Sequence, residues 1–403
     1  MKYGLIVFKN TCNLGDDIQS YSIKRLLPHI DYYIEREQIN VFFPDEDEKE
    51  KVKTILGGWY CHNNFIFPPS PYIDPLFIST HFTNELQEEI PSYFTDRFLS
   101  YLKQYEPIYL RDNLIKKYLD NYNIANCFSG CTTLTLEKFE NVEKTNNICL
   151  VDLDYFVTAN IKKDYKNVIE VTHNVDKEYT NLPYEERFAY VEDRLKLYQS
   201  SKCVITSRLH CALPCLALGV PVVLVYNGSN ADVHNRISEY TKFLNYISVE
   251  EFSENYKDTI DNITKNSEDF IPLKDTILSR INLFINKEFE STKKIDIKQY
   301  FIEQNRNTEQ VFENITSRII SESEERYNCL KDLEHRYQRL KLIYEGLLKE
   351  KEILTQNSQK LYDEFIVTNN ELYRVVNSQS YKLSRCITKV FNFIKRKNKD
   401  FRR

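Results

Sequence analysis

Glycine, proline and methionine are scarce in this chain of 403 residues, and they are unevenly placed. The sequence has eight glycines, twelve prolines and one methionine. No proline follows Pro272, and only Gly346 follows Gly228 among the glycines. Because these residues interrupt helices, the last third is predicted to be mostly helical.

Long apolar runs and a repeated cysteine framework are also missing. No stretch approaches eighteen apolar residues, which excludes a membrane span. The apolar start at residues 1–8 is too short for a signal peptide. The ten cysteines are scattered, which favours reduced thiols in the cytoplasm. Two pairs at helical spacing could bind zinc, but without a second pair they are better explained as small core residues: Cys127 with Cys131, and Cys211 with Cys215.

The net charge of −5 hides a basic end. Residues 381–403 contain nine Lys or Arg against the single acid Asp400, so the rest is strongly acidic. An acidic body argues against nucleic acid as a partner.

Alternating apolar strands and helices predict an α/β protein with two Rossmann-like lobes facing a cleft. In the first lobe, 1–146, a strand at 3–8, a turn at 13–17 and a helix at 18–27 open the pattern, and 76–79 is predicted as a further strand. In the second lobe, 147–295, strands are predicted at 148–152, 168–172, 203–206 and 221–226, with helices at 184–200 and 211–218.

Residues 296–378 are predicted to form a helical linker and a coiled coil. Apolar residues recur at alternating steps of three and four, which is typical of a coiled coil that joins copies of the chain. A single helix packed back on the body remains the alternative. The repeat comprises Leu330, Leu333, Tyr337, Leu340, Tyr344, Leu347, Leu354, Leu361, Phe365, Leu372 and Val375.

The tail, 379–403, has an apolar stripe beside basic residues. This pattern suits a helix lying on an anionic membrane surface, and equally a solvated basic end. The expected location is therefore cytoplasmic, either free or peripheral at the inner face of the membrane.

Candidate ligand-binding residues lie where predicted strands end. Arg208, Leu209 and His210 follow one strand and begin a helix, where main-chain amides attract anions. A guanidinium there can hold phosphate or carboxylate, and a histidine can donate a proton. A salt-bridged arginine with a satisfied histidine is the structural alternative. His173 ends another strand, and Arg236 is a candidate second anion contact.

The turn at residues 13–17 offers a second candidate cluster. Gly15 permits close backbone approach, and Asp16 or Asp17 could act as a base, although either could equally cap the helix. His81 faces the same cleft in this interpretation. No spacing typical of metal ligands is present.

Several segments together resemble one family. These are Asn13-Leu14-Gly15-Asp16, Leu110-Arg111-Asp112, residues 128–136, and residues 206–210 with 217–221. In this order they resemble the polysaccharide pyruvyl transferases over roughly residues 1–250.

The resemblance implies a fold like that of GT-B glycosyltransferases and phosphoenolpyruvate as co-substrate, with no cofactor. It places the donor at Arg208, Leu209 and His210, and the acceptor sugar or polysaccharide precursor near Asn13, Gly15, Asp16 and His81. In this hypothesis His210 is the acid and Asp16 the base. Two alternatives stay open: a nucleotide-sugar-dependent glycosyltransferase, and a non-catalytic coiled-coil scaffold of a polysaccharide-synthesis complex.

Overall fold

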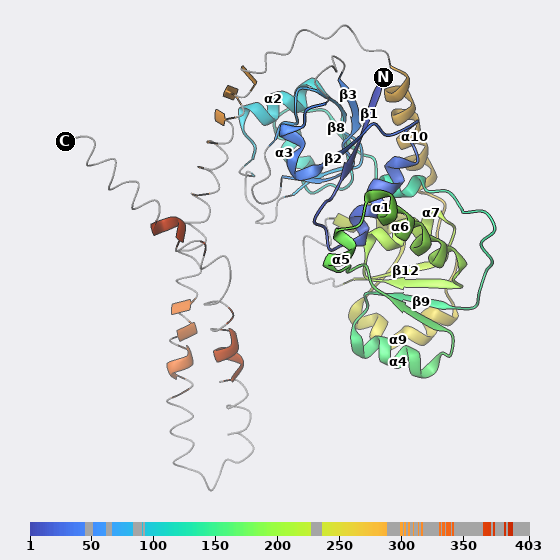
Figure 1. Ribbon diagram of the computed structural model, residues 1–403. Helices are drawn as coiled ribbons and strands as arrows, with labels where there is room; N and C mark the ends of the chain where they lie inside the picture. Colours follow the sequence, from blue (N-terminus) through green and yellow to red (C-terminus); the bar gives the residue numbers. More distant parts are fainter. Residues whose placement is uncertain are drawn as a thin grey trace. The chain divides into compact units, whose positions relative to one another are not determined.

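The computed structural model describes residues 1–287 apart from 45–50, 62–66, 84–90, 92 and 227–235; beyond residue 298 it describes only short helical stretches. The chain divides into two compact units, Met1–Asn307 and Thr308–Arg403. The first contains every strand found among the described residues (Figure 1). The predicted coiled coil and basic tail fall largely outside the described residues, so oligomerisation and membrane contact stay predictions.

Two four-stranded parallel sheets form the N-terminal half. The first has the order β2-β1-β3-β5 and the second the order β4-β6-β7-β8. Their strands are β1 (Lys2–Val7), β2 (Tyr32–Glu35), β3 (Val52–Ile55), β4 (Gly58–Tyr60), β5 (Ile73–Leu76), β6 (Thr80–Phe82), β7 (Ile108–Leu110) and β8 (Asn126–Phe128).

A five-stranded parallel sheet follows, in the order β10-β9-β11-β12-β13. Four of its strands match the predicted ones to within a residue at each end. The strands are β9 (Ile148–Val151), β10 (Val168–Val171), β11 (Cys203–Thr206), β12 (Val222–Tyr226) and β13 (Asn245–Ser248).

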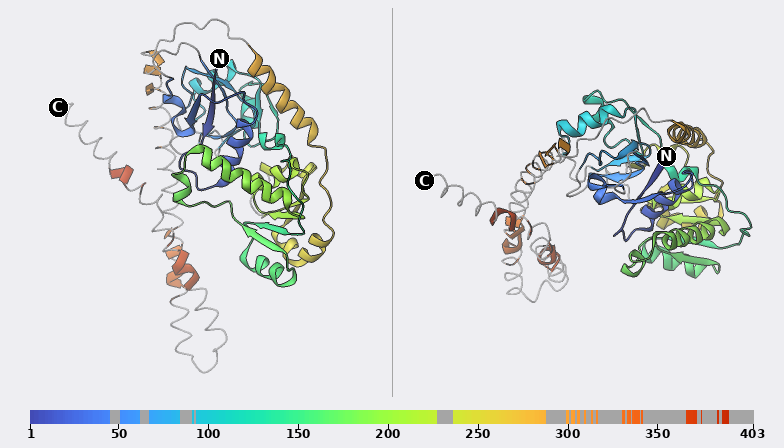
Figure 2. Two further views of the ribbon diagram at one scale, coloured as in Figure 1. Left: turned by 45° about the vertical axis from the view of Figure 1, so that its right-hand side comes forward. Right: turned by 45° about the horizontal axis from the view of Figure 1, so that its top comes forward.

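Helices cover these sheets, as Figure 2 shows from two further sides. They are α1 (Leu14–Lys24), α2 (Asp96–Gln104), α3 (Lys116–Asn121), α4 (Tyr155–Asp164), α5 (Lys177–Thr180), α6 (Tyr184–Ser200), α7 (Leu209–Ala217), α9 (Val249–Asp261) and α10 (Ile271–Asn286).

The five-stranded sheet is covered on both faces. Along β9, Cys149 belongs to the core shared with α1, α6 and α7, whereas Leu150 packs with Val157 of α4 and Phe252 of α9. Successive strand residues point to opposite faces, which explains why this strand is apolar throughout. Figure 1 shows α4 and α9 across the sheet from α6 and α7.

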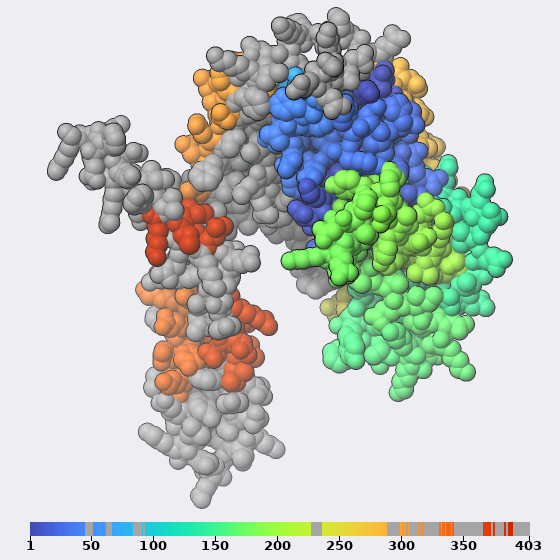
Figure 3. Space-filling model, in the orientation of Figure 1, coloured from blue at the N-terminus to red at the C-terminus, as the bar shows by residue number. Residues whose placement is uncertain are grey.

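One apolar core joins the N-terminal and C-terminal sheets. Leu5 and Val7 of β1, Ile18 of α1, and Leu213 of α7 are fully buried in the same cluster. The space-filling view shows the two halves in direct contact along this junction (Figure 3). Continuous apolar packing of this kind holds the loops of both halves in a fixed relation.

Two predicted boundaries differ from the structure. The strand expected at 76–79 lies earlier, at Ile73–Leu76, and contains Pro75. β5 is an edge strand, so it tolerates a residue that lacks a main-chain N–H. Helix α1 begins at Leu14 rather than Ile18, because the Asn13 side chain accepts a hydrogen bond from the Gly15 N–H at 3.1 Å.

Candidate functional site

The candidate site forms where the order of successive strands reverses in two of the sheets. From β9 the chain places β10 on one side and β11 on the other, and β2 and β3 flank β1 in the same way. Ligands of open parallel sheets bind at such points, beyond the carboxyl ends of the strands. Arg208 follows β11, Asp152 follows β9, and Asp16 lies beyond β1.

Arg208 is held in a defined orientation. Its Nε donates to Asp152 Oδ2 at 2.9 Å, and its Nη2 donates to Asn174 Oδ1 at 3.0 Å. Its main-chain N–H donates to the Thr206 hydroxyl at 2.9 Å. Within the described residues Nη1 has no hydrogen-bond partner, and 37% of the side chain is exposed. The guanidinium therefore keeps donors available for an anion.

Asp152 supplies the charge that orients Arg208. Its backbone adopts the left-handed region, with φ 53°. Burial raises the pKa of this carboxyl, but hydrogen bonds from the Thr172 hydroxyl and the His173 N–H, together with the Arg208 charge, outweigh burial and lower it. Asp152 is therefore ionised at neutral pH, and the ion pair with Arg208 is maintained.

Main-chain hydrogen bonds tie the two halves together beside this ion pair. The Leu14 N–H donates to the His173 carbonyl at 2.8 Å, and the Val175 N–H donates to the Cys12 carbonyl at 2.9 Å. Asn13 and Asn174 form an antiparallel bridge between them. The loop after β1 is therefore fixed against the loop after β10.

A cavity of about 290 Å³ opens at the N-terminus of α7. Two arginines and two histidines are among its lining residues, which suits a small anion. It is lined by Asn13, His173, Ser207, Arg208, Leu209, His210, Leu224, Tyr226, Arg236 and Ile237.

His210 lines this cavity and carries a buried ring nitrogen. Its Nε2 makes no hydrogen bond within the described part of the chain. Burial lowers the pKa of His210 well below its usual value, and the charges of Arg111 and Arg236 lower it further. The imidazole is therefore neutral at pH 7, and an anion beside it would favour its protonation.

His173 lies beneath the cavity. Its side chain is fully buried, and its Nε2 lies 2.7 Å from the Tyr198 hydroxyl. Its carbonyl accepts from Leu14, as described above. These contacts support a positioning role, with Nε2 of the imidazole engaged by Tyr198, whereas Nδ1 has no hydrogen-bond partner within the described residues.

Asp16 is buried and hydrogen-bonded on both oxygens. Oδ2 accepts from the Thr11 hydroxyl at 2.6 Å, and Oδ1 accepts from Trp59 Nε1 at 3.1 Å. The Trp59 ring stacks on the guanidinium of Arg36, whose Cζ is 3.8 Å from the ring centroid. Burial raises the pKa of Asp16 in spite of these contacts.

Asp17 does not face a ligand site. Its carboxylate forms a buried ion pair with Arg187 at 2.8 Å and accepts from the Tyr179 hydroxyl at 2.6 Å. Of the two neighbouring aspartates, Asp17 therefore joins α1 to α6 through its ion pair with Arg187.

His81 lies in β6, next to the residues that follow β7. Its Nδ1 is 2.7 Å from Asp112 Oδ2. Arg111 is buried beside them and donates to the Gln19 side chain. The charges of Arg111 and Arg236 act on His81, Asp112 and His210 alike, so these groups form one electrostatic cluster.

The structure brings together most of the residues singled out from the sequence. Six of them line the cavity: Asn13, His173, Arg208, Leu209, His210 and Arg236. Gly15 touches His210, since a Cβ at Gly15 would lie 3.1 Å from the His210 Cβ. Asp16 and His81 lie on the first-half side and do not line it.

Sequence reasoning missed Asn174 and Trp59. Asn174 fixes Arg208, and Trp59 fixes Asp16. Trp59 is the single tryptophan of the chain, but nothing in its local pattern ties it to Asp16. Asn174 follows a predicted strand end, which was the one available signal.

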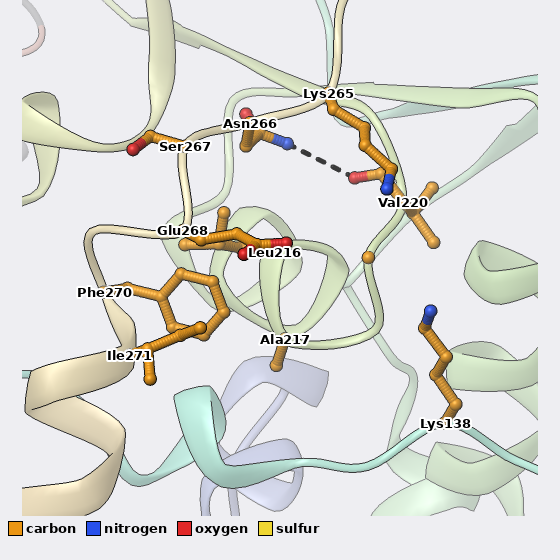
Figure 4. Close-up of a pocket in the computed structure, with 11 residues that line it drawn as sticks. Lys138, Leu216, Ala217, Val220, Lys265, Asn266, Ser267, Glu268, Phe270 and Ile271 are labelled. Atoms are coloured by element: carbon orange, nitrogen blue, oxygen red, sulfur yellow. Dashed lines mark hydrogen bonds between the residues drawn. The ribbon is translucent and has the colours of Figure 1, made fainter.

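A second cavity, of about 170 Å³, lies at the opposite end of α7 (Figure 4). Exposed Lys138 and Lys265 border it, and Asn266 donates to the Val220 carbonyl at 3.3 Å. A Cβ at Gly219, where φ is 68°, would lie 3.1 Å from Lys138 Cε. None of the predicted site residues lines this cavity.

The described part of the chain contains no group of three or more His, Cys, Asp or Glu side chains placed to hold a metal ion. Among the same residues, no helix is both long and apolar enough to cross a bilayer.

Two solved structures match this chain at low similarity. One is a protein of uncharacterized function from Klebsiella pneumoniae, which has 12% identity and a TM-score of 0.36 over 61% of this chain and 92% of its own. Another is the Methanocaldococcus jannaschii UDP-GlcNAc 2-epimerase in complex with UDP-GlcNAc and UDP, which has 12% identity and a TM-score of 0.33 over 76% of this chain and 99% of its own. No curated protein matches the sequence.

A family model gives the assignment. Residues 13–230 match the model of the polysaccharide pyruvyl transferases, which is more than half of the chain. The matched segment includes Arg208, His210, Asp152, His81 and Asp16. The chain therefore belongs to the polysaccharide pyruvyl transferase family, and this membership implies transferase activity.

Proposed function

We propose that this protein transfers a pyruvyl group from phosphoenolpyruvate to two hydroxyls of a sugar, forming a ketal. The acceptor is a polysaccharide or its lipid-linked precursor. The observation that carries the proposal is that His210, whose buried Nε2 has no partner within the described residues, lines a cavity together with Arg208 and Arg236. A small donor with a carboxylate and a phosphate matches these positive groups.

The chemistry requires an acid, a base and an anion clamp. A proton adds to the methylene carbon of the donor, a sugar oxygen bonds to its central carbon, and phosphate leaves before the second hydroxyl closes the ketal. One hydroxyl proton balances the proton at the methyl group, and the other leaves on hydrogen phosphate. The reaction therefore needs no oxidant or cofactor.

Each donor-side residue has a role in this proposal. Arg208, oriented by Asp152, holds the carboxylate or phosphate. His210 takes up a proton when the anionic donor enters and delivers it to the methylene carbon. A fixed clamp of this kind can contribute several kcal/mol to lowering the barrier. The two sheet regions, joined at the cavity, would then correspond to the two lobes of a GT-B-like enzyme.

Thermal stability with candidate donors tests the proposal. Phosphoenolpyruvate is expected to raise the melting temperature, because a ligand at 100 times its Kd stabilises the native state by about 2.7 kcal/mol. Arg208→Ala should abolish this shift and transfer while leaving the fold intact. Arg25→Ala is the matched control, because Arg25 pairs with Glu137 and does not line the cavity.

Three results would contradict the proposal or the role of Arg208 in it. Stabilisation by a nucleotide sugar and none by phosphoenolpyruvate would favour the glycosyltransferase alternative. A response to none of these donors would favour the scaffold alternative. Normal phosphoenolpyruvate-dependent phosphate release by Arg208→Ala would remove Arg208 from the donor site.

A further inference from the structure

The proposed reaction needs a base on the acceptor side, and Asp16 is poorly placed for it. Both of its oxygens already accept hydrogen bonds, from the Thr11 hydroxyl and from Trp59 Nε1. Only 4% of the residue is exposed. A sugar hydroxyl would have to compete with two protein donors that hold this carboxylate in place. Asp16 is better explained as the fixed N-terminal anchor of α1.

His81 and Asp112 form a close, buried pair. His81 Nδ1 lies 2.7 Å from Asp112 Oδ2, and Asp112 Oδ1 accepts the Leu114 N–H at 3.2 Å. The carboxylate is therefore fixed by its own turn. Its contact with Nδ1 is short but not aligned as a hydrogen bond in this structure. A modest rotation of the ring would give the arrangement by which a carboxylate sets the tautomer of a catalytic histidine.

The charge states of the pair favour the same role. Burial raises the pKa of Asp112, but His81 and the charges of Arg111 and Arg236 outweigh it and hold the pKa at about 2. Burial lowers the pKa of His81. At neutral pH the carboxylate is ionised and the imidazole neutral, so the proton lies on Nδ1 and the lone pair on Nε2.

The pair also belongs to the electrostatic cluster around the cavity. Arg236, which lines the cavity, acts on both His81 and Asp112. His81 is in turn among the groups that lower the pKa of His210. The candidate base and the candidate acid thus lie close enough to act on each other electrostatically, although His81 does not line the cavity.

We propose that His81 is the base that takes the proton from the attacking sugar hydroxyl, and that Asp112 positions it. This inference rests on the proposed function. The sugar O–H bond breaks, its proton passes to His81 Nε2, and the oxygen bonds to the central carbon of phosphoenolpyruvate. The proton at the methylene carbon comes from His210, and hydrogen phosphate carries the surplus proton away.

The experiment separates donor binding from transfer. His81→Gln should keep the melting-temperature shift with phosphoenolpyruvate but lower kcat by about 100-fold or more, as loss of a general base does. The transfer assay measures phosphate release with a panel of p-nitrophenyl hexosides and confirms the ketal by mass spectrometry. His29→Gln is the control, since His29 is an exposed histidine paired with Asp31.

Asp112→Asn distinguishes a positioning role of Asp112 from a purely structural one, because only the positioning role predicts a change in the pH dependence of the rate. The Asp112 charge raises the pKa of His81 against the effect of burial. Removing that charge should shift the acidic limb of the rate profile to lower pH and lower the plateau. Nitrogen-15 NMR of the wild-type protein should show the proton of His81 on Nδ1, with the resonance assigned by its loss in His81→Gln.

Three results would overturn the inference. The first is turnover of His81→Gln close to that of the wild type, and the second is a His81 proton on Nε2. The third is loss of the phosphoenolpyruvate shift in His81→Gln, which would make His81 a donor ligand. If the wild type itself shows no phosphoenolpyruvate shift, the proposed function fails, and with it the reaction in which His81 would act.

Discussion

Arg187 Nη2 on α6 and Asp17 Oδ2 on α1 lie 2.8 Å apart, with both side chains buried. The same Arg187 nitrogen donates to the Phe8 carbonyl at 2.8 Å. The end of β1, the start of α1 and the start of α6 are therefore held by one guanidinium. The site loop beyond Phe8 follows directly from this anchored strand end.

Removal of that guanidinium should be costly. Arg187→Met leaves the Asp17 carboxylate buried and unpaired, and the free energy of unfolding is expected to fall by about 3–5 kcal/mol in urea titrations. Lys196→Met, which breaks an exposed pair with Glu192 on the same helix, should cost less than about 1 kcal/mol. Equal costs for the two variants would contradict this account.

Lys53 is expected to hold the C-terminal end of α10. Its Nζ donates to the carbonyls of Phe284, Ile285 and Lys287, and the residue is 1% exposed. Lys53→Met should lower the free energy of unfolding by about 1–3 kcal/mol, because three carbonyls at the end of α10 lose their donor. Lys202→Met, at an exposed lysine, is the control. An unchanged urea midpoint for Lys53→Met would refute the prediction.

Gly15→Ala should separate activity from stability. The new Cβ would lie 3.1 Å from His210 Cβ and 3.2 Å from His210 Nδ1, so the imidazole must move. Alanine is favoured over glycine in helices by about 1 kcal/mol, so stability should hold. Transfer should fall by up to about 100-fold, as expected when a catalytic group is displaced by about 1 Å.

NMR provides the structural check for Gly15→Ala. The His210 imidazole resonances should shift, whereas those of the exposed His29 should not. An unmoved His210 signal together with normal turnover would show that the loop yields instead of the histidine.

Stability should depend on pH through His210. Its pKa is lower in the folded protein than in the unfolded chain, so below about pH 6.5 the unfolded chain binds more protons. The free energy of unfolding should therefore fall as the pH decreases, by at most about 1.4 kcal/mol per pH unit from this group. His210→Asn should show a shallower fall between about pH 7.5 and 5.5, measured by urea titration. Parallel curves for the two proteins would exclude this effect.

Donor binding should raise the pKa of His210, which burial and the nearby arginines lower. A bound phosphate or carboxylate favours the imidazolium, so phosphoenolpyruvate should bind with proton uptake near pH 7. Calorimetry in two buffers of different ionisation enthalpy measures this uptake. His210→Asn should bind with less proton uptake, and equal uptake by both proteins would assign the proton to another group.

Local patterns in the sequence were sufficient for much of the second sheet. Strand β9 is an uninterrupted apolar run, and β11 is apolar up to its last residue, Thr206. Helix α6 was predicted with its observed limits, Tyr184–Ser200. Gly219, with φ 68°, follows the end of α7 where the pattern indicated a stop. Arg208 and His210 could be singled out because a strand end followed by a helix start is itself a local signal.

Contacts between distant segments could not be predicted in this way. Asp17 and Arg187 are far apart in sequence, and nothing local distinguishes the ion-paired Asp17 from Asp16 beside it. His81 could be suspected alone, but its pairing with Asp112 depends on β6 lying next to β7 in the sheet. The sequence by itself determined strands β9 to β12, the limits of α6 and the residue types at the site. Tertiary packing decided which side chains are paired and which pKa values shift, because burial and charge act through space rather than along the chain.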